Sequence, residues 1–307
     1  MKITGVEAIP LSIPMKAMEP PSPWQGGTFE SQVIVVVTTD EGIVGYGEAF
    51  GLGIAAAACQ TVIRSLKPLL LGRDPLQITA LTEELFRRLH VFGRYGITVF
   101  AISGVEIALW DIAGKAAGVP LYRLLGGAST QEVEADASPT TPVFSGRGPR
   151  GAPAQGVKAY ASFLRYDQPE HVAQVVGDAL EEGYDTLKLH QIDVESVQAA
   201  RQVAGDDVRL CMDVNCVWTP QEAVEMARRL APYNLYWLEE PVWPPEDYQG
   251  LARVQAAGGT PIASGENICT VFAFRDMVAQ GAATFLQPSV TKVGGIAEWR
   301  KIATLAE

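Results

Sequence analysis

The fold is decided by three stretches, each an apolar run that ends beside an acidic residue: VRLCMDVN (residues 208–215), LYWLEEP (235–241) and PIASGEN (261–267). The acidic residues are Asp213, Glu239 and Glu266, at intervals of 26 and 27 residues. Short apolar runs are typical of strands buried on both faces of a parallel sheet. Because each interval has room for one strand and one helix, the three stretches predict successive β/α units.

The same alternation continues on both sides of these stretches, from Val157 to the last residue. Strand-like runs end near six residues: Phe163, His190, Val214, Pro241, Gly265 and Ser289. Helical patterns lie between them, for example at 169–182, 195–204, 220–231 and 271–280. Units of roughly 25–30 residues predict a parallel (β/α) TIM-like barrel over residues 157–307. A Rossmann sheet is disfavoured, because GYGEAF at 45–50 lacks the final glycine of GxGxxG and no Walker A sequence occurs.

The number of strand-like runs is small for a closed barrel. An eight-stranded barrel typically needs about 250 residues, whereas residues 157–307 contain only the six runs. An open parallel sheet would expose a long apolar edge. We therefore expect a barrel that is incomplete at the C-terminal end of this sequence, with further residues needed to close it.

The first part of the chain is organised differently. Strand patterns occur at 3–11, 32–39 and 43–49, and helical patterns at 55–69, 77–89 and 98–117. Strands followed by a run of helices predict an α+β domain over residues 1–125. Within it, the Pro- and Gly-rich residues 15–29, with Trp24 at their middle, are a candidate lid, and an ordinary surface loop is the alternative. Residues 126–156 have no periodicity and predict a linker or a disordered loop.

Composition and charge narrow the classes of function. The net charge of −11 disfavours a nucleic acid or an anionic membrane as the partner. No leader sequence and no apolar run of membrane-spanning length is found. The four cysteines form no CxxC pair, which is typical of buried thiols in a reducing compartment. We expect a soluble cytoplasmic protein.

The three acidic residues are the first candidate site. In barrel enzymes the C-terminal ends of the strands form the face that carries the chemistry, and Asp213, Glu239 and Glu266 are all expected there. Carboxylates are the ligands that Mg²⁺ prefers. One acidic residue in such a place more often caps a helix or faces solvent. Three in register favour a metal site.

A lysine and a histidine are the second candidate pair. Lys188 and His190 lie in TLKLHQ (186–191), and alternate residues of a strand point to the same side, so both can enter the barrel mouth. Near a divalent cation they are candidates for proton transfer. A lysine paired to an acid and a core histidine are the alternative. Asn215 shares a face with Asp213, where it can bind a metal-bound water or cap a turn.

Several motifs together resemble the enolase superfamily, in the mandelate-racemase-like branch of its mandelate racemase/muconate lactonizing enzyme family. In the N-terminal part these are GIVGYGEAF (42–50) and AISGVEIALWDIAGKAAGVPLYRLLGG (101–127). In the barrel they are LKLH, DVN, WLEEPV, SGEN and QPSVTKVGG. The resemblance covers nearly the whole chain outside 126–156, and implies that the N-terminal α+β domain caps the barrel.

The resemblance also implies roles for the candidate residues. The implied Mg²⁺ ligands are Asp213, Glu239 and Glu266. Lys188 and His190 occupy the place of a Lys-x-Lys motif, so His190 is expected to be the base and Lys188 to stabilise charge or tune the pKa of His190. Such enzymes remove a proton alpha to a carboxylate, and the metal stabilises the enediolate that forms. The loop around Trp24 and the turn after Glu48 are expected to exclude water and select the substrate.

One departure from the family pattern bears on the reaction. Ser289 stands where mandelate-racemase-like members carry Asp and muconate-lactonizing members carry Lys, so a His–Asp dyad cannot form there. A one-sided acid/base pair favours dehydration of an acid sugar or hydroxy acid. A racemase or epimerase, which needs a second base, and a non-catalytic protein are the alternatives. Trp24, Asn215 and Ser289 are the candidate substrate contacts, and the family implies a homo-oligomer.

Overall fold

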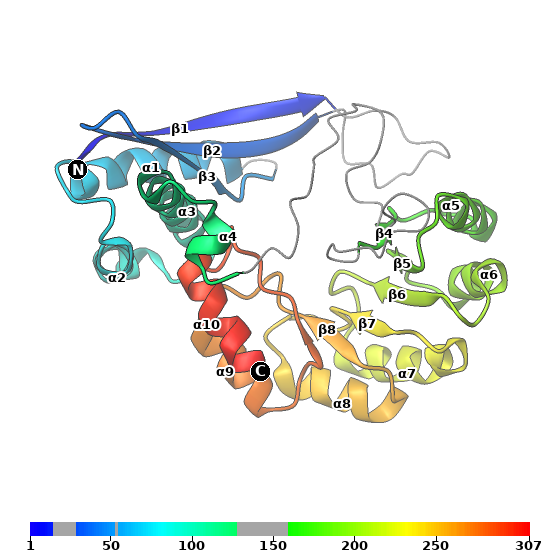
Figure 1. The fold of residues 1–307 in the computed structure, drawn as a ribbon. Coiled ribbons are helices and arrows are strands. Elements are labelled where there is room, and N and C mark those ends of the chain that lie inside the picture. The colour runs from blue at the N-terminus through cyan, green and yellow to red at the C-terminus, as the bar shows by residue number, and fades with distance from the viewer. Residues whose placement is uncertain (15–28, 53–54, 128–158) are drawn as a thin grey trace.

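The computed structural model describes residues 1–14, 29–52, 55–127 and 159–307, which form two packed bodies of secondary structure (Figure 1). The N-terminal body is an antiparallel sheet covered by helices. The C-terminal body is a curved parallel sheet with helices along its outer side. Trp24 and most of the predicted lid and linker lie outside the described residues. The lid, the linker and the domain boundaries beside them therefore stay predictions.

The N-terminal sheet has the order β1–β2–β3, with all pairs antiparallel. Its strands are β1 (Ile3–Pro14), β2 (Phe29–Thr39) and β3 (Val44–Ala49). Val33, Val35 and Val37 of β2 are fully buried, while the residues between them are partly exposed. Such alternation is what a sheet covered on one face requires. The three predicted strands are confirmed, and β1 and β2 each extend three residues further than the sequence pattern indicated.

The helices that cover this sheet follow it in the chain. They are α1 (Ala55–Leu70), α2 (Ile78–Leu89), η1 (His90–Phe92), α3 (Ile97–Ala117) and α4 (Leu121–Leu124). Helix α3 lies so close to β3 that a Cβ on Gly47 would be 2.1 Å from the carbonyl oxygen of Gly104, so glycine is required there. Of the described helices, α3 alone is long and apolar enough to cross a membrane, but 67% of its apolar window is buried inside the protein.

The C-terminal sheet has six parallel strands in sequential order. They are β4 (Ala161–Ser162), β5 (Thr186–Leu189), β6 (Arg209–Asp213), β7 (Trp237–Glu239), β8 (Ile262–Ser264) and β9 (Phe285–Leu286). The intervening helices are α5 (Pro169–Glu181), α6 (Val194–Ala204), α7 (Pro220–Leu230), η2 (Ala231–Tyr233), α8 (Tyr248–Gly258), α9 (Val271–Ala279) and α10 (Ile296–Ala306). The predicted β/α alternation is confirmed, and each helix predicted by residue range agrees with the structure to within one residue at either end.

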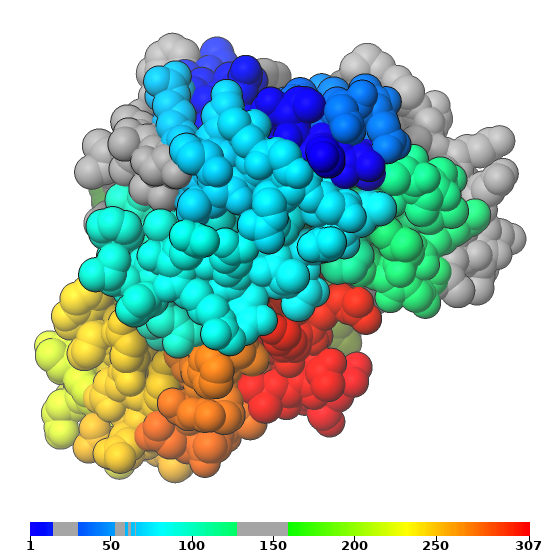
Figure 2. All heavy atoms as spheres, turned by 90° about the vertical axis from the view of Figure 1, so that its left-hand side faces the viewer, coloured from blue at the N-terminus to red at the C-terminus, as the bar shows by residue number. Residues whose placement is uncertain are grey.

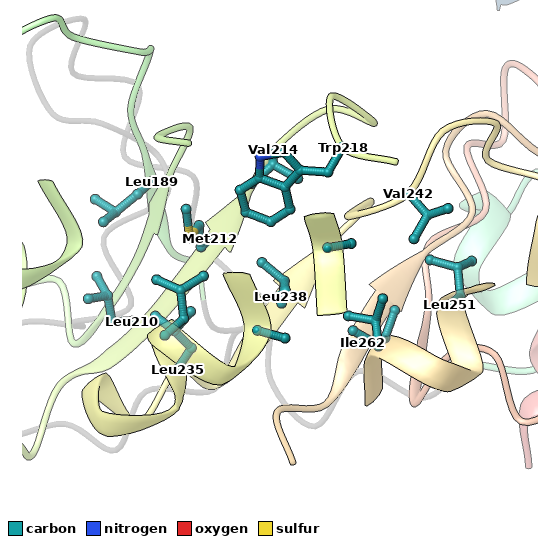
Figure 3. Packing of buried hydrophobic residues seen from close by; sticks show 14 of the residues in the cluster. Leu189, Leu210, Met212, Val214, Trp218, Leu235, Leu238, Val242, Leu251 and Ile262 are labelled. Atoms are coloured by element: carbon teal, nitrogen blue, oxygen red, sulfur yellow. The ribbon is translucent and has the colours of Figure 1, made fainter. Parts of the chain in front are cut away.

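The main core lies between this sheet and its outer helices. Leu210, Met212, Leu238 and Ile262 are fully buried and share one apolar cluster with Leu251 of α8 (Figure 3). Because neighbouring strand residues point to opposite faces, the residues that alternate with these four point to the inner side of the curved sheet. The inner side is therefore where the candidate site must lie.

Two buried side chains of α3 fasten the N-terminal body to the C-terminal one. The Glu106 carboxylate, which is fully buried, accepts hydrogen bonds from the backbone N–H groups of Ile296 (2.7 Å) and Ala297 (2.9 Å) at the start of α10. Ser103 Oγ accepts another from Gly294 (2.8 Å). A carboxylate at a helix N-terminus satisfies donors that the helix cannot pair itself. Figure 2 shows the result, with residues of α2 lying directly above α9 and α10.

We expect Glu106→Ala to lower the free energy of unfolding by about 2–4 kcal/mol, because it leaves three part-buried donors without an acceptor. These are the two N–H groups of α10 and the indole Nε1 of Trp110, which donates to Glu106 Oε1 at 2.8 Å. Urea unfolding measures the change. Glu83→Ala is the matched control, since Glu83 is an exposed residue of α2 that pairs with Arg87. Equal stability of the two variants would contradict the role of Glu106.

Candidate active site

Two of the three predicted metal ligands lie side by side at the C-terminal ends of neighbouring strands. Asp213 is the last residue of β6, Glu239 is the last residue of β7, and the two are register partners. Their side chains are 1% and 2% exposed. The strand alternation explains why, because Met212 and Leu238 pack in the outer core and turn their neighbours inward.

Lys188 of β5 lies between these carboxylates. Its Nζ is 2.8 Å from Asp213 Oδ2 and 2.6 Å from Glu239 Oε1. Burial disfavours all three charges, but attraction outweighs it for two of the groups, so the pKa of Lys188 is raised and the pKa of Asp213 is lowered. The pKa of Glu239 is raised, first by burial and then by the charge of Asp213. One ammonium between two carboxylates leaves a buried surplus of negative charge.

His190 lies beside this cluster, one residue beyond the end of β5. Its Nδ1 is hydrogen-bonded to the carbonyl oxygen of Phe163, and its Nε2 is 3.2 Å from Asp213 Oδ2. A carbonyl oxygen can only accept, so Nδ1 donates to Phe163, while Nε2 is the ring nitrogen that faces the carboxylate cluster. Its side chain is 21% exposed, more than that of Lys188 or Asp213, so His190 is accessible to a small molecule.

Two further donors fix the carboxylates. The backbone N–H of Asn215 donates to Asp213 Oδ1 at 2.9 Å, from a residue with a φ of 50°. The indole Nε1 of Trp237 donates to Glu239 Oε2 at 2.9 Å. Each carboxylate therefore has both oxygens engaged, which holds its plane in one orientation. Asn215 contributes through its backbone, and its exposed side chain stays a predicted substrate contact.

The third predicted ligand, Glu266, contacts a different lysine from the one between the other two. It follows β8 by two residues, its side chain is 43% exposed, and its Oε1 is 3.8 Å from Lys292 Nζ. Lys292 is 9% exposed, and its Nζ lies 4.2 Å from the ring centroid of Phe50, which follows β3. Such a contact between ammonium and ring face is a cation–π interaction. Lys292 therefore links the N-terminal body to the edge of the candidate site.

Other acidic groups add to the negative charge. The carboxylate of Glu240 is 2% exposed and accepts hydrogen bonds from Asn267 Nδ2 at 2.9 and 3.1 Å. Burial, followed by the charges of Glu266 and Asp213, raises the pKa of Glu240 to about 7. Carboxylates held this close together need positive charge beyond that of Lys188.

The donor set fits Mg²⁺ in chemistry and charge. Asp213 and Glu239 offer hard oxygen atoms that both contact one small cation, the ammonium of Lys188, and the cluster carries surplus negative charge. The described residues contain no group of three His, Cys, Asp or Glu side chains arranged around a metal position. Glu266 therefore has to turn toward the other two carboxylates to act as a third ligand.

Of the remaining predicted residues, Ser289 is half-buried in the turn after β9, where its Oγ lies 3.1 Å from Thr291 Oγ1. Trp237, Lys292 and Gln287 were not among the residues that the sequence predicted for the site. Trp237 offered a signal, since it precedes Glu239 by two residues and so shares its strand face. Lys292 and Gln287 follow the sixth strand, and their partners Phe50 and Glu239 are distant in sequence.

Comparison with known proteins identifies the class to which this fold and site belong. The N-terminal domain of mandelate racemase/muconate lactonizing enzymes matches residues 14–126, and the enolase C-terminal domain-like family matches residues 171–307. The chain belongs to the enolase superfamily, in its mandelate racemase/muconate lactonizing enzyme family. Solved relatives share the TIM barrel with an N-terminal capping domain, so the predicted fold class is confirmed.

The relatives are enzymes that act on acid sugars. The chain is 35% identical to 3,6-anhydro-alpha-L-galactonate cycloisomerase of Streptomyces coelicolor, over 92% of this chain and 73% of the relative. It is 36% identical to D-xylonate dehydratase of Haloferax volcanii, over 90% of this chain and 66% of the relative. Other relatives are dehydratases of arabinonate, D-mannonate and D-galactonate. A racemase from Streptomyces coelicolor, solved with bound magnesium, superposes with a TM-score of 0.81 at 32% identity, over 99% of this chain and 80% of that one.

Proposed function

We propose that this protein is a Mg²⁺-dependent enzyme that removes the proton alpha to the carboxylate of an acid sugar and then eliminates water. The observation that carries the proposal is the buried cluster of Asp213, Lys188 and Glu239 at the strand ends, with His190 Nε2 beside it. The relatives named as acid-sugar dehydratases support the choice of substrate class.

Asp213, Glu239 and Glu266 are the proposed Mg²⁺ ligands. Bound there, the metal supplies positive charge that stabilises the substrate carboxylate as its alpha proton leaves. Lys188 remains an ammonium between two carboxylates, so it stabilises negative charge and does not accept the proton. His190 Nε2 is the proposed base, because Nδ1 is engaged by the Phe163 carbonyl and Nε2 is the ring nitrogen that faces the cluster.

In the elimination, the C–H bond alpha to the carboxylate breaks and its proton passes to His190 Nε2. The electron pair forms a carbon–carbon double bond as the β C–O bond breaks. The hydroxyl leaves as water after it takes the proton back from the imidazolium. One group can serve both steps, which agrees with Ser289 standing where a second acid/base residue would be expected.

A cycloisomerase is the second candidate, favoured by the 35% identical relative from Streptomyces coelicolor. Its first step is the same proton removal, but the oxygen that leaves the β carbon stays attached to the product, so no water is lost. A racemase or epimerase would need a base on the opposite side of the substrate. A non-catalytic protein is disfavoured by the retained buried carboxylates.

The proposal also covers the substrate contacts, the oligomeric state and the cellular compartment. We retain Trp24, Asn215 and Ser289 as candidate substrate contacts, and a small carboxylate as the only proposed ligand besides Mg²⁺. We also propose a homo-oligomer in the cytoplasm without nucleic-acid or membrane partners, in keeping with the net charge of −11.

The test is a panel of xylonate, arabinonate, galactonate and mannonate with millimolar Mg²⁺, assayed for 2-keto-3-deoxy acids. We expect turnover of at least one, abolished by EDTA. His190→Asn should lower kcat about 10²–10⁴-fold. His90→Asn is the matched control, because His90 also engages a carbonyl through Nδ1 but is exposed on η1. Deuterium uptake from D₂O without elimination would favour a racemase, and no metal binding would overturn the proposal.

A further inference from the structure

Gln287 lies at the end of the sixth strand of the C-terminal sheet, two residues before Ser289. It follows β9 directly, and its backbone N–H donates to the carbonyl of Ser264 at 3.0 Å, which continues the parallel pairing. Phe285 packs on the ring of Trp237 (5.5 Å between centroids), while Leu286 packs on the outer core. By strand alternation Gln287 points inward, on the same side as Phe285.

The two ends of the Gln287 amide have different surroundings. The amide donates a hydrogen bond to the Glu239 carboxylate. Its Oε1 is buried, and no hydrogen-bond donor reaches it within the part of the chain that the structure describes. A buried amide oxygen without a donor is unfavourable, and such exceptions in proteins need a cause.

The donors around Glu239 are already engaged by other groups and do not provide the missing hydrogen bond. The indole Nε1 of Trp237 already donates to Glu239 Oε2, and the ammonium of Lys188 is held by Asp213 and Glu239. An amide oxygen accepts hydrogen bonds and can also ligate a hard cation, so its partner is an O–H or N–H group or the metal, and the measurement of Mg²⁺ affinity described below separates the two. A carboxylate cannot fill that role, but a sugar hydroxyl can.

We propose that Gln287 is a substrate-binding residue whose Oε1 accepts a hydrogen bond from a hydroxyl group of the acid sugar while its amide N–H holds Glu239. The inference rests on the proposed function and narrows it, because the substrate must carry a hydroxyl group near the carboxylate that approaches the proposed metal. A site built to hydrogen-bond a hydroxyl rejects the analogue that lacks it, by about 10⁴–10⁵-fold in well-characterised enzymes. Gln287 would therefore select polyhydroxylated acids over plain carboxylic acids.

The test compares Gln287→Met, which keeps the length of the side chain, with wild type on the best acid sugar of the panel and on its monodeoxy analogues as inhibitors. We expect kcat/KM to fall about 10²–10³-fold and the preference for the full sugar over one monodeoxy analogue to disappear. The Kd of Mg²⁺ alone, from calorimetry, should stay within about threefold, because the carboxylate ligands are retained.

Gln255→Met is the matched control. Gln255 of α8 uses its Oε1 fully, as acceptor from the Ile262 N–H (3.1 Å) and the Thr284 hydroxyl (2.9 Å). This variant should lose thermal stability by about 3 °C or more and keep its kcat/KM. Gln287→Met should instead keep its thermal stability and lose kcat/KM.

Each failure has its own signature. If Mg²⁺ binding weakens as much as kcat/KM, Gln287 acts on the metal site alone. If the full sugar and every monodeoxy analogue are affected equally, its role is structural. Either outcome overturns the inference and leaves the proposed function intact. If wild type neither binds nor converts any acid sugar, the proposed function fails and the inference falls with it.

Discussion

Asparagine in place of Asp213 is expected to lower kcat/KM by about 10³–10⁴-fold or more, because the loss of a metal ligand removes several kcal/mol of transition-state stabilisation. The substitution keeps the shape of the side chain and an oxygen that can accept from the Asn215 N–H. It removes the charge that faces Lys188, and it can place an amide NH₂ against an ammonium. Calorimetric titration should show weaker Mg²⁺ binding, and the acid-sugar assay should show lost turnover.

The chain offers a close control for this substitution. Asp111 of α3 also accepts from a lysine, Lys115 at 2.7 Å, and from a backbone N–H, that of Tyr46 at 2.8 Å, but its side chain is 32% exposed. Asp111→Asn makes the same chemical change on the surface of the N-terminal body, and should leave Mg²⁺ affinity and turnover as in wild type. If Asp213→Asn behaved like Asp111→Asn, the metal site would have to be placed elsewhere.

Elements that depend on local pattern were predictable from the sequence. The 26- and 27-residue intervals between the acidic residues are the β/α period itself, and the structure confirms the parallel order β4 to β9. Asp213 and Glu239 were expected at strand ends and lie there. In each case the signal is short in range, because side-chain periodicity and caps are encoded within a few residues.

Contacts between distant segments were not predictable. The carboxylate of Glu106 caps a helix about 190 residues later, and Lys292 meets Phe50 across the junction of the two bodies. Glu266 was expected beside Asp213 and Glu239 because all three follow strands, and its contact with Lys292 at 3.8 Å was not expected. Strand spacing places a residue at the correct edge, but side-chain rotamers and nearby charges decide which groups meet.

Methionine in place of Lys188 is expected to lower the free energy of unfolding in EDTA by about 3–5 kcal/mol, because it leaves buried carboxylates without their cation. Both Asp213 and Glu239 lose their nearest positive charge, at 2.8 and 2.6 Å. The lysine methylenes are largely replaced by the methionine side chain, so packing changes little. Urea unfolding in metal-free buffer measures the loss.

The pH dependence of this loss has a definite sign. The pKa of Asp213 is lowered in the folded protein from its ordinary value of 3.8, so its contribution to stability is present above that value and is lost as the pH falls through the folded pKa. The pKa of Lys188 is raised from 10.5, so its contribution is lost only as the pH rises beyond that value. Between these limits, near neutral pH, the difference between wild type and Lys188→Met should be largest, and it should shrink in strong acid.

Mg²⁺ should reverse much of the defect. A divalent cation bound by Asp213 and Glu239 takes over the charge compensation that Lys188 gives the metal-free protein, and a ligand that binds only the folded state stabilises it in proportion to its affinity. Saturating Mg²⁺ should therefore raise the Tm of Lys188→Met more than that of wild type, although turnover stays low because the ammonium is missing. Lys115→Met is the control, since Lys115 pairs with Asp111 at the surface. An equal Mg²⁺ effect in Lys188→Met and Lys115→Met would mean that the metal and Lys188 do not share the same carboxylates.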